Sequence, residues 1–532
     1  MLKTPQLFTS RHILKCVAFS AALLFFSSAP AQQKDTTAIR YSAFITSSDL
    51  KKHLSIIASD DFEGRETGKP GQQKAADYIA AQFKLFGIPT LKDGLYFQKF
   101  DVYPVNSSKT VITVNNKEYH FLEDFYSYRG TSELITESDK ILFLGYGIDE
   151  KNYSDYKDVD VKDKVLMILG GEPFRDSINL VTGKPGTTEL SEEPKLKSKL
   201  ARTKGARALF VVVDDFEADL NKVTFLAEHS PLSLDKPENI PMPVFYLSKK
   251  MAEDILSAMK MHKSVKDIKN KISKTGNTLN SLASVKTKID YRFADATLHS
   301  ENVLGYVEGS DLKDQLLVVS AHYDHLGVVD GKIFNGADDD GSGTVSVIEL
   351  AQTFMKAKKE GHGPRRSILF MTVAGEEKGL LGSSYYTDHP VFPLASTVCD
   401  LNIDMVGRVD KKHTDSTNYI YVIGSAMLSS GLHKVSENCD RLYCGLRLDY
   451  TYDDPNDKNR FYYRSDHYNF AKNNIPVIFY FNGTHADYHK ETDEVQKIDF
   501  ALMEKRVKLV FYTAWTIANM DDRLVVDVQQ KK

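Results

Sequence analysis

The stretch that decides the fold is Val318–Gly343, which reads VVSAHYDHLGVVDGKIFNGADDDGSG. It begins as an apolar run and reaches His322 and Asp324 where that run ends. After a short loop it continues into three consecutive aspartates, Asp338–Asp340, and then into glycines and a helix-like sequence. Imidazole and carboxylate groups this close together are the ligands that a divalent metal ion requires. The stretch therefore predicts half of a metal site on a strand, a loop and a helix.

The sequence around and beyond this stretch alternates between strand patterns and helix patterns. Strands are predicted at 315–321, 367–373, 397–403, 419–423 and 475–481, and helices at 342–358, 379–387, 425–438 and 500–519. Such alternation is typical of a mostly parallel or mixed sheet with helices on both faces, so the predicted fold class is α/β. In sheets of this kind, ligands bind at the carboxyl ends of the strands.

The N-terminal half of the chain divides into segments of different character. Residues 1–31 have a charged start, a short apolar run and an Ala-Pro-Ala end, which predicts a cleaved signal peptide, with an uncleaved anchor as the alternative. Residues 32–124 begin with a polar lead-in and continue with two amphipathic helices, one from Ser47 and one over 72–86. Residues 125–285 are rich in strands and hold no cluster of candidate ligands, so we expect an inserted β-rich domain there. Residues 286–532 then form the main part of the ligand-bearing domain.

Composition and charge exclude some classes of partner. The 532 residues are 42% hydrophobic and 26% charged, which is typical of a globular chain with more than one domain. Residues 1–31 contain three basic residues and no acidic ones, so their removal changes the net charge from −4 to −7. A mildly acidic chain lacks the basic surface of a nucleic-acid-binding protein. We expect no nucleic-acid partner, no membrane span in the mature chain, and a periplasmic, cell-surface or secreted location.

The three cysteines beyond residue 31 are Cys399, Cys439 and Cys444. An exported protein is permitted a disulfide, and Cys439 and Cys444 are close enough in sequence to form one. Buried free thiols fit the same sequence equally well. The chain has no Cys-x-x-Cys pattern, so a zinc site made of thiolates is not predicted.

Further candidate ligands follow other predicted strands. Glu376 and Glu377 come just after 367–373, and Asp404 comes just after 397–403. Adjacent glutamates point in different directions, so one can bind a metal ion while the other acts as a base. His489, preceded by Tyr488, lies beyond the last strand. Each motif alone has an ordinary structural explanation, but together they suit two metal ions that share one carboxylate.

The residues that flank the first ligand candidate differ in what they can do. Asp324 is two residues after His322, so both side chains point to the same side of a strand, and the carboxylate can orient the imidazole. His325 points to the opposite face if the strand continues, which argues against it as a ligand. Spacing alone does not choose among the three aspartates.

Five motifs in order, AHYDHLG, NGADDDGSG, AGEEKGLLGS, NIDMVGR and YHKETD, closely resemble those of the secreted co-catalytic di-zinc aminopeptidases, peptidase family M28. The match spans about 300–520. In addition, FEGRETGKPGQQKAADYIA resembles the N-terminal helices of that family, and 125–285 is similar to a protease-associated (PA) domain. The resemblance implies the zinc exopeptidase fold, two zinc ions as cofactors and peptides as substrates.

The same resemblance implies a role for each motif. Asp339 would be the carboxylate that bridges the two zinc ions. One zinc ion would take His322 and Asp404, and the other would take Glu377 and His489.

Other residues would act beside the metal ions. Glu376 would be the general base toward zinc-bound water, and Tyr488 would polarise the tetrahedral intermediate. Asp324 would orient His322. Asp466 and His467, in the further motif RSDHYNFAKNNIPV, are candidates for supporting or substrate-side residues, as is Arg408.

The implied function is that of an exported metallo-exopeptidase, in the first place an aminopeptidase. A carboxypeptidase- or dipeptidase-like activity would need cations to hold a terminal carboxylate, and Arg408, Arg464 and Lys490 are available. A glutaminyl cyclase is disfavoured because those relatives hold one zinc ion, and a non-catalytic binding ectodomain is disfavoured because all five ligand positions are present. We expect the insert to shape the mouth of the active site, with a passive packing module as the alternative.

Overall fold

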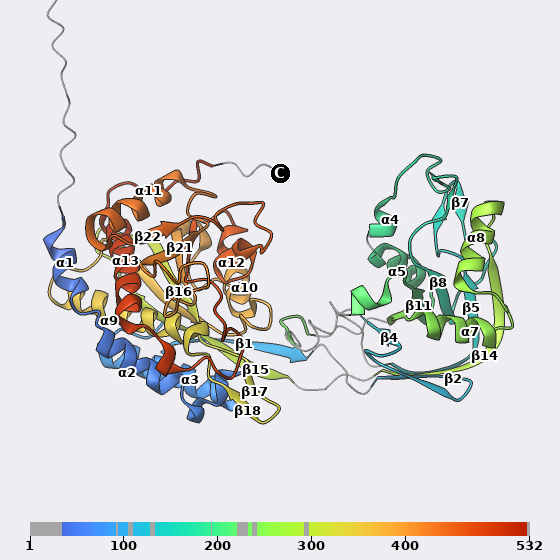
Figure 1. Ribbon diagram of the computed structural model, residues 1–532, viewed down its shortest axis with the longest axis horizontal. Coiled ribbons are helices and arrows are strands. Elements are labelled where there is room, and N and C mark those ends of the chain that lie inside the picture. Colours follow the sequence, from blue (N-terminus) through green and yellow to red (C-terminus); the bar gives the residue numbers. More distant parts are fainter. Residues whose placement is uncertain are drawn as a thin grey trace, which may run out of the picture.

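The computed structural model describes residues 34–91, 94–104, 110–127, 134–192, 194–220, 232–236, 242–291 and 297–528. The expected signal peptide, residues 1–31, lies outside these residues. Most described strands belong to one nine-stranded sheet and one eight-stranded sheet. Figure 1 shows the two sheets in separate bodies, each with its own helices.

The nine-stranded sheet has the strand order β12-β1-β15-β19-β16-β20-β23-β21-β22. Its centre consists of four parallel strands, which are β19 (Arg366–Val373), β16 (Leu312–His322), β20 (Thr397–Ile403) and β23 (Val477–Phe481). Antiparallel pairing begins on either side of this centre, with β15 (Leu298–Val307) and β1 (Phe97–Pro104) at one margin and β21 (Tyr419–Ile423) at the other. The short strand β22 (Arg447–Asp449) pairs in parallel with β21. The predicted α/β class, with a mostly parallel or mixed sheet, is confirmed.

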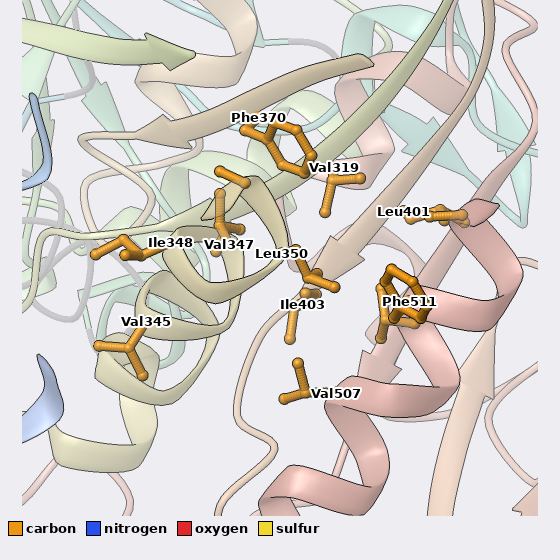
Figure 2. Packing of buried hydrophobic residues seen from close by; sticks show 14 of the residues in the cluster. Val319, Val345, Val347, Ile348, Leu350, Phe370, Leu401, Ile403, Val507 and Phe511 are labelled. Atoms are coloured by element: carbon orange, nitrogen blue, oxygen red, sulfur yellow. The ribbon is translucent and has the colours of Figure 1, made fainter. Parts of the chain in front are cut away.

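Alternate side chains of the central strands enter two different cores. In β16, Leu317 and Val319 belong to one core, and Leu316 and Val318 belong to the other, because successive side chains of a strand point to opposite faces. The first core is covered by α2 (Ser47–Ile57), α3 (Pro70–Phe86), α9 (Gly343–Lys359), α11 (Ser430–Cys439) and α13 (Phe500–Asn519). The second is covered by α10 (Leu381–Asp388) and α12 (His467–Ala471). Figure 2 shows side chains of α9 and α13 packed against those of the strands in the first core.

Capping residues account for several helix ends. The Asp499 carboxylate accepts a hydrogen bond from the Leu502 backbone N–H and caps α13, while Gly87 ends α3 in the left-handed conformation. Helix α1 (Thr36–Ser42) lies where a polar lead-in was expected. Its Tyr41 is fully buried and stacks on Trp515 of α13. A helix of only seven residues is too short to show an apolar period in the sequence, which is why it was missed.

The eight-stranded sheet has the order β3-β2-β14-β5-β8-β11-β13-β4. Its strands are β2 (Val111–Val114), β3 (Lys117–His120), β4 (Phe125–Tyr126), β5 (Leu134–Leu144), β8 (Val165–Leu169), β11 (Ala208–Val212), β13 (Val244–Leu247) and β14 (Asn280–Tyr291). Two further cores flank this sheet, and α7 (Lys249–Ala258) and α8 (Val265–Thr275) belong to one of them.

The strands of this second sheet extend beyond both expected boundaries of the insert, residues 125 and 285, to Val111 and Tyr291. In the other direction, β12 (Leu232–Ser233) comes from within 125–285 but pairs with β1 of the nine-stranded sheet. A two-residue strand carries no periodic signal, so the sequence could not reveal this pairing. The division into a peptidase domain and a PA-like insert stays a proposal.

Cys399, Cys439 and Cys444 are free thiols in the structure, and the first two are buried. Sγ of Cys439 lies 3.4 Å from the carbonyl oxygen of Tyr512. Of the two alternatives that the sequence left open, the structure has the free thiols. In the part of the chain that is described, no helix combines the length and the apolar character needed to cross a membrane.

Phe511 provides a test of the first core. It is fully buried, and its ring centroid lies 5.2 Å from that of Phe354. We expect Phe511→Ala to lower the free energy of unfolding by about 3–5 kcal/mol, because it leaves a cavity that the core cannot close. Urea denaturation followed by circular dichroism measures this change. The control is Leu85→Ala, whose side chain is 76% exposed and whose effect should stay within about 0.5 kcal/mol. Equal losses in the two variants would contradict the described core.

Candidate metal centre

The four central parallel strands bring acidic and imidazole groups to one edge of the sheet. His322 is the last residue of β16, and Asp404 directly follows the neighbouring strand β20. Glu376 and Glu377 lie just past the end of β19, and His489 lies on the segment that follows β23. Because parallel strands end at the same edge, residues far apart in the sequence meet there.

His322, Asp339 and Asp404 form the first group of converging ligand atoms. Nε2 of His322 lies 3.3 Å from Oδ1 of Asp339 and 3.8 Å from Oδ2 of Asp404. All three side chains are buried.

Asp339 presents its other carboxylate oxygen to a second group. Oδ2 of Asp339 lies 3.1 Å from Nε2 of His489, and that nitrogen lies 3.2 Å from Oε2 of Glu377. Of the three consecutive aspartates, Asp339 is therefore the one between the two groups. The structure brings all five predicted metal ligands together.

Ligand atoms of His325, Asp339 and Glu377 also lie within 4.8 Å of one another, although strand alternation in the sequence argues against His325 as a ligand. Its Nδ1 lies 2.8 Å from Oε1 of Glu377, and its side chain is fully buried. Strand alternation does not apply to His325, because β16 ends at His322 and the backbone then turns. The N–H of His325 donates to the carbonyl of Arg65. In this position His325 can bind a metal ion directly, or it can donate to Glu377 and orient it toward His489.

The chemistry of the two groups fits a pair of divalent metal ions. Oδ2 of Asp339 and Oε1 of Glu377 are buried, and each faces an imidazole nitrogen, of His489 at 3.1 Å and of His325 at 2.8 Å, without the geometry of a hydrogen bond. Burial on its own lowers the pKa of an imidazole, yet the nearby carboxylates of Glu377 and Asp339 raise the pKa of His489 to about 11. The pKa of His322 is likewise raised well above its usual value, against the effect of burial, by Glu376 and the neighbouring aspartates. The cluster therefore attracts positive charge, and its nitrogen and oxygen donors suit zinc.

Asp324 connects a ligand to the candidate base. Nδ1 of His322 lies 3.1 Å from the backbone carbonyl oxygen of Asp324, within hydrogen-bond distance, and 3.6 Å from its Oδ1. That Oδ1 accepts a hydrogen bond from the backbone N–H of Glu376. The other carboxylate oxygen of Asp324 accepts a hydrogen bond from the hydroxyl of Thr67. This is the place expected for a residue that orients His322.

The aspartates on either side of Asp339 bind protein groups. Asp340 accepts hydrogen bonds from the backbone N–H groups of Met405, Gly343 and His322. Asp338 accepts one from the backbone N–H of Gly407. The triple aspartate thus ties β16, α9 and the segment after β20 together around one central carboxylate.

Arg65 is a supporting residue that the sequence did not single out. Its guanidinium is fully buried and donates hydrogen bonds to four backbone carbonyls, which belong to Ile57, Tyr323, Asn335 and Gly336. Arg65 therefore holds both ends of the loop between His322 and Asp339. An arginine in a turn-rich segment is ordinarily exposed, so the sequence held no signal for this role.

Asp493 supports the site from the other side. Its carboxylate Oδ2 accepts hydrogen bonds from the backbone N–H groups of Asp338 at 2.9 Å and Asp339 at 3.1 Å, and its carbonyl accepts one from Ala337. Asp493 follows His489 closely in the chain. Its hydrogen bonds therefore hold the segment that carries the proposed ligand His489 against the backbone of Asp339, the proposed shared ligand. Asp493 is the last residue of the YHKETD motif, but the spacing of residues in the sequence does not indicate a role for it.

A pocket opens next to both groups. It is lined by Asp339, Glu376, Asp404, Met405, Phe461, Arg464, Phe479, Phe481, Thr484, Tyr488 and His489. Burial raises the pKa of Glu376, and the carboxylates of Glu377 and Asp404 raise it further. Burial also raises the pKa of Tyr488 well above its usual value, so its hydroxyl stays protonated and can donate a hydrogen bond into the pocket. The ring of Tyr488 stacks on that of His489.

Three predicted supporting or substrate-side residues do not line this pocket. Asp466 accepts a hydrogen bond from Ser383, and burial raises its pKa to about 7. His467 stacks on Phe479 behind the pocket wall, and burial lowers its pKa to about 3. Arg408 donates to the carboxylate of Asp487.

Comparison with known proteins adds independent evidence. Residues 302–514 match the model of Peptidase family M28. Aminopeptidase YwaD of Bacillus subtilis is 34% identical over 118 residues, which are 22% of this chain and 24% of that protein. The probable glutamate carboxypeptidase LAMP1 of Arabidopsis thaliana is 35% identical over 118 residues, which are 22% of this chain and 16% of that protein. Transferrin receptor protein 1 of Gallus gallus is 23% identical over 417 residues, which are 74% of this chain and 50% of the receptor.

The chain thus spans half the length of the receptor and a quarter or less of the two enzymes. Among solved structures, the aminopeptidase from Aneurinibacillus sp. strain AM-1 superposes with a TM-score of 0.53 at 15% identity, covering 93% of this chain and 98% of that one. This likeness supports the fold. Residues 302–514 therefore carry the peptidase family M28 domain.

Proposed function

We propose that the protein is an exported di-zinc metallo-exopeptidase, in the first place an aminopeptidase that releases N-terminal residues. The observation that carries the proposal is the position of Asp339 between two ligand groups, with Glu376 beside them on one pocket. The name aminopeptidase is that of the Bacillus subtilis relative and of the solved Aneurinibacillus structure.

The residues of the pocket have complementary roles in this proposal. Two zinc ions, when bound, would polarise the scissile carbonyl and activate a water molecule. Oε2 of Glu376 lies 3.9 Å from Nε2 of the ligand His322, so its carboxylate is placed to take a proton from that water and pass it to the leaving amine. Tyr488 can donate a hydrogen bond to the oxygen on which negative charge develops. Asp324 lies beside His322 and holds the backbone of Glu376 through a hydrogen bond, so it fixes the position of one relative to the other.

A carboxypeptidase- or dipeptidase-like action is the second candidate. It is favoured by the name of the Arabidopsis relative and by Arg464, a cation on the pocket wall. Of the other two cations considered, Arg408 pairs with Asp487, and Lys490 donates to the carbonyl of Ala486. A glutaminyl cyclase or a non-catalytic ectodomain is less favoured because both ligand groups are complete.

Glu376→Gln tests the proposed base. The substitution keeps the size of the side chain and removes its ability to accept a proton, so we expect kcat to fall by about 10²–10⁴-fold. Zinc content should stay at the native value, since Glu376 is not among the proposed ligands. Steady-state hydrolysis of a dipeptide and elemental analysis measure the two quantities. Undiminished hydrolysis by the zinc-loaded variant would show that another group is the base.

Asp339→Ala and Asp404→Ala test the shared ligand. The native protein should bind two zinc ions, and chelation should abolish hydrolysis until zinc is returned. Loss of Asp339 should weaken both sites, whereas loss of Asp404 should weaken one, so zinc retained after dialysis should fall further in the first variant. A native protein with one tightly bound zinc ion that cyclises N-terminal glutamine would instead support the cyclase.

Blocked dipeptides separate the two exopeptidase candidates. An aminopeptidase recognises the free amine, so N-acetylation of the dipeptide should abolish its hydrolysis. A dipeptide with an amidated C-terminus should still be hydrolysed at its peptide bond. Product release followed by chromatography measures both reactions. Cleavage of the acetylated dipeptide with no cleavage of the amidated one would assign the second candidate.

A further inference from the structure

We propose that Arg464 binds a carboxylate on the leaving side of the substrate. The preferred substrates are then dipeptides, whose α-carboxylate lies one residue past the scissile bond, or peptides with an acidic side chain at that residue. This inference rests on the proposed function and names its substrate class.

Arg464 stands close to the proposed metal ligands. It directly follows the short 3₁₀ helix η5 (Phe461–Tyr463) and lines the same pocket as Asp339 and Glu376. A guanidinium nitrogen, Nη2, lies 3.4 Å from the hydroxyl of Tyr488. The Tyr488 ring in turn stacks on the ligand His489, with 3.9 Å between centroids. The guanidinium thus contacts Tyr488, which in turn contacts the proposed ligand His489.

The charge of Arg464 is available to a ligand. Among the described residues no carboxylate forms an ion pair with it, and its side-chain contacts are the Tyr488 hydroxyl and the ring of Phe461. By contrast, Arg408 is paired with Asp487, and Arg365 is paired with Asp311 and Asp521. Arg464 is exposed, and no other arginine or lysine among the described residues lines the pocket. Its N–H groups are thus free to bind a carboxylate through two parallel hydrogen bonds.

Distance and charge both fit a carboxylate one residue beyond the scissile bond. An extended residue spans about 3.3–3.6 Å. A carboxylate one residue past the scissile bond therefore lies within one side-chain length of the reacting carbonyl. The proposed zinc ions would offset the acids Asp339 and Asp404 on the pocket wall, so a carboxylate of the substrate still needs a cation of its own. Arg464 supplies that cation on the side of Tyr488.

Three substrates test the proposal, namely Leu-Leu, Leu-Leu amide and Leu-Glu amide. For Arg464→Gln we expect KM for Leu-Leu to rise roughly tenfold to a hundredfold with kcat little changed, since a charge-assisted hydrogen bond contributes about 1.5–3 kcal/mol. KM for Leu-Leu amide should stay the same. A rise for Leu-Glu amide would show that a side-chain carboxylate is also accepted, and no rise would restrict recognition to the α-carboxylate. Arg464→Lys should recover part of the loss.

Arg460→Gln is the matched control. Arg460 is exposed and lies at the other end of η5, and its guanidinium likewise sits over an aromatic ring, that of Tyr463, but it does not line the pocket. This variant should leave all three KM values unchanged. Equal increases for Leu-Leu and its amide in Arg464→Gln would mean that Arg464 only supports Tyr488, and would overturn the proposal. If zinc-loaded native protein cleaved none of the three, the proposed function would fall, and this inference with it.

Discussion

The position of the Asp339 carboxylate is the constraint on which the rest of the site depends. One of its oxygens faces His322 and the other faces His489, so a shift of this carboxylate would disturb both groups at once. The surrounding protein fixes its backbone through Asp493, and Arg65 fixes the loop that leads to it. Neither of these residues is among the proposed ligands, yet together they decide whether the ligands meet.

The central sheet makes this concentration of charge possible. Buried carboxylates are costly without a partner, and this site gathers several of them where four parallel strands end. The two cores on either side of the sheet hold those strand ends in place. Backbone N–H groups donate to both oxygens of Asp340 and to Oδ1 of Asp338, while Oδ2 of Asp338 lies 3.2 Å from Nε2 of His485. Asp339 and Glu377 instead turn buried oxygens toward the imidazoles of His489 and His325, which is an arrangement that a cation could occupy.

Much of the peptidase fold could be predicted because its elements are long and periodic. Strand 397–403 and helix 500–519 have in the structure the bounds that their apolar patterns predict. His322, Glu377, Asp404 and His489 were indicated as candidate ligands by their places after predicted strands, and the family resemblance implied Asp339 as the fifth. Spacing alone could not choose Asp339 among the three aspartates, because that choice depends on contacts between distant segments. The turn that brings His325 to Glu377 and the burial of Arg65 also depend on contacts between distant segments. Short elements such as α1 and β12 carry too little sequence to show a period.

The most direct test of this account is to locate zinc in crystals of the native protein by anomalous diffraction at the zinc edge. We expect two peaks that share Asp339, one between His322 and Asp404 and the other between Glu377 and His489. A single peak, or two peaks that do not both contact Asp339, would contradict it.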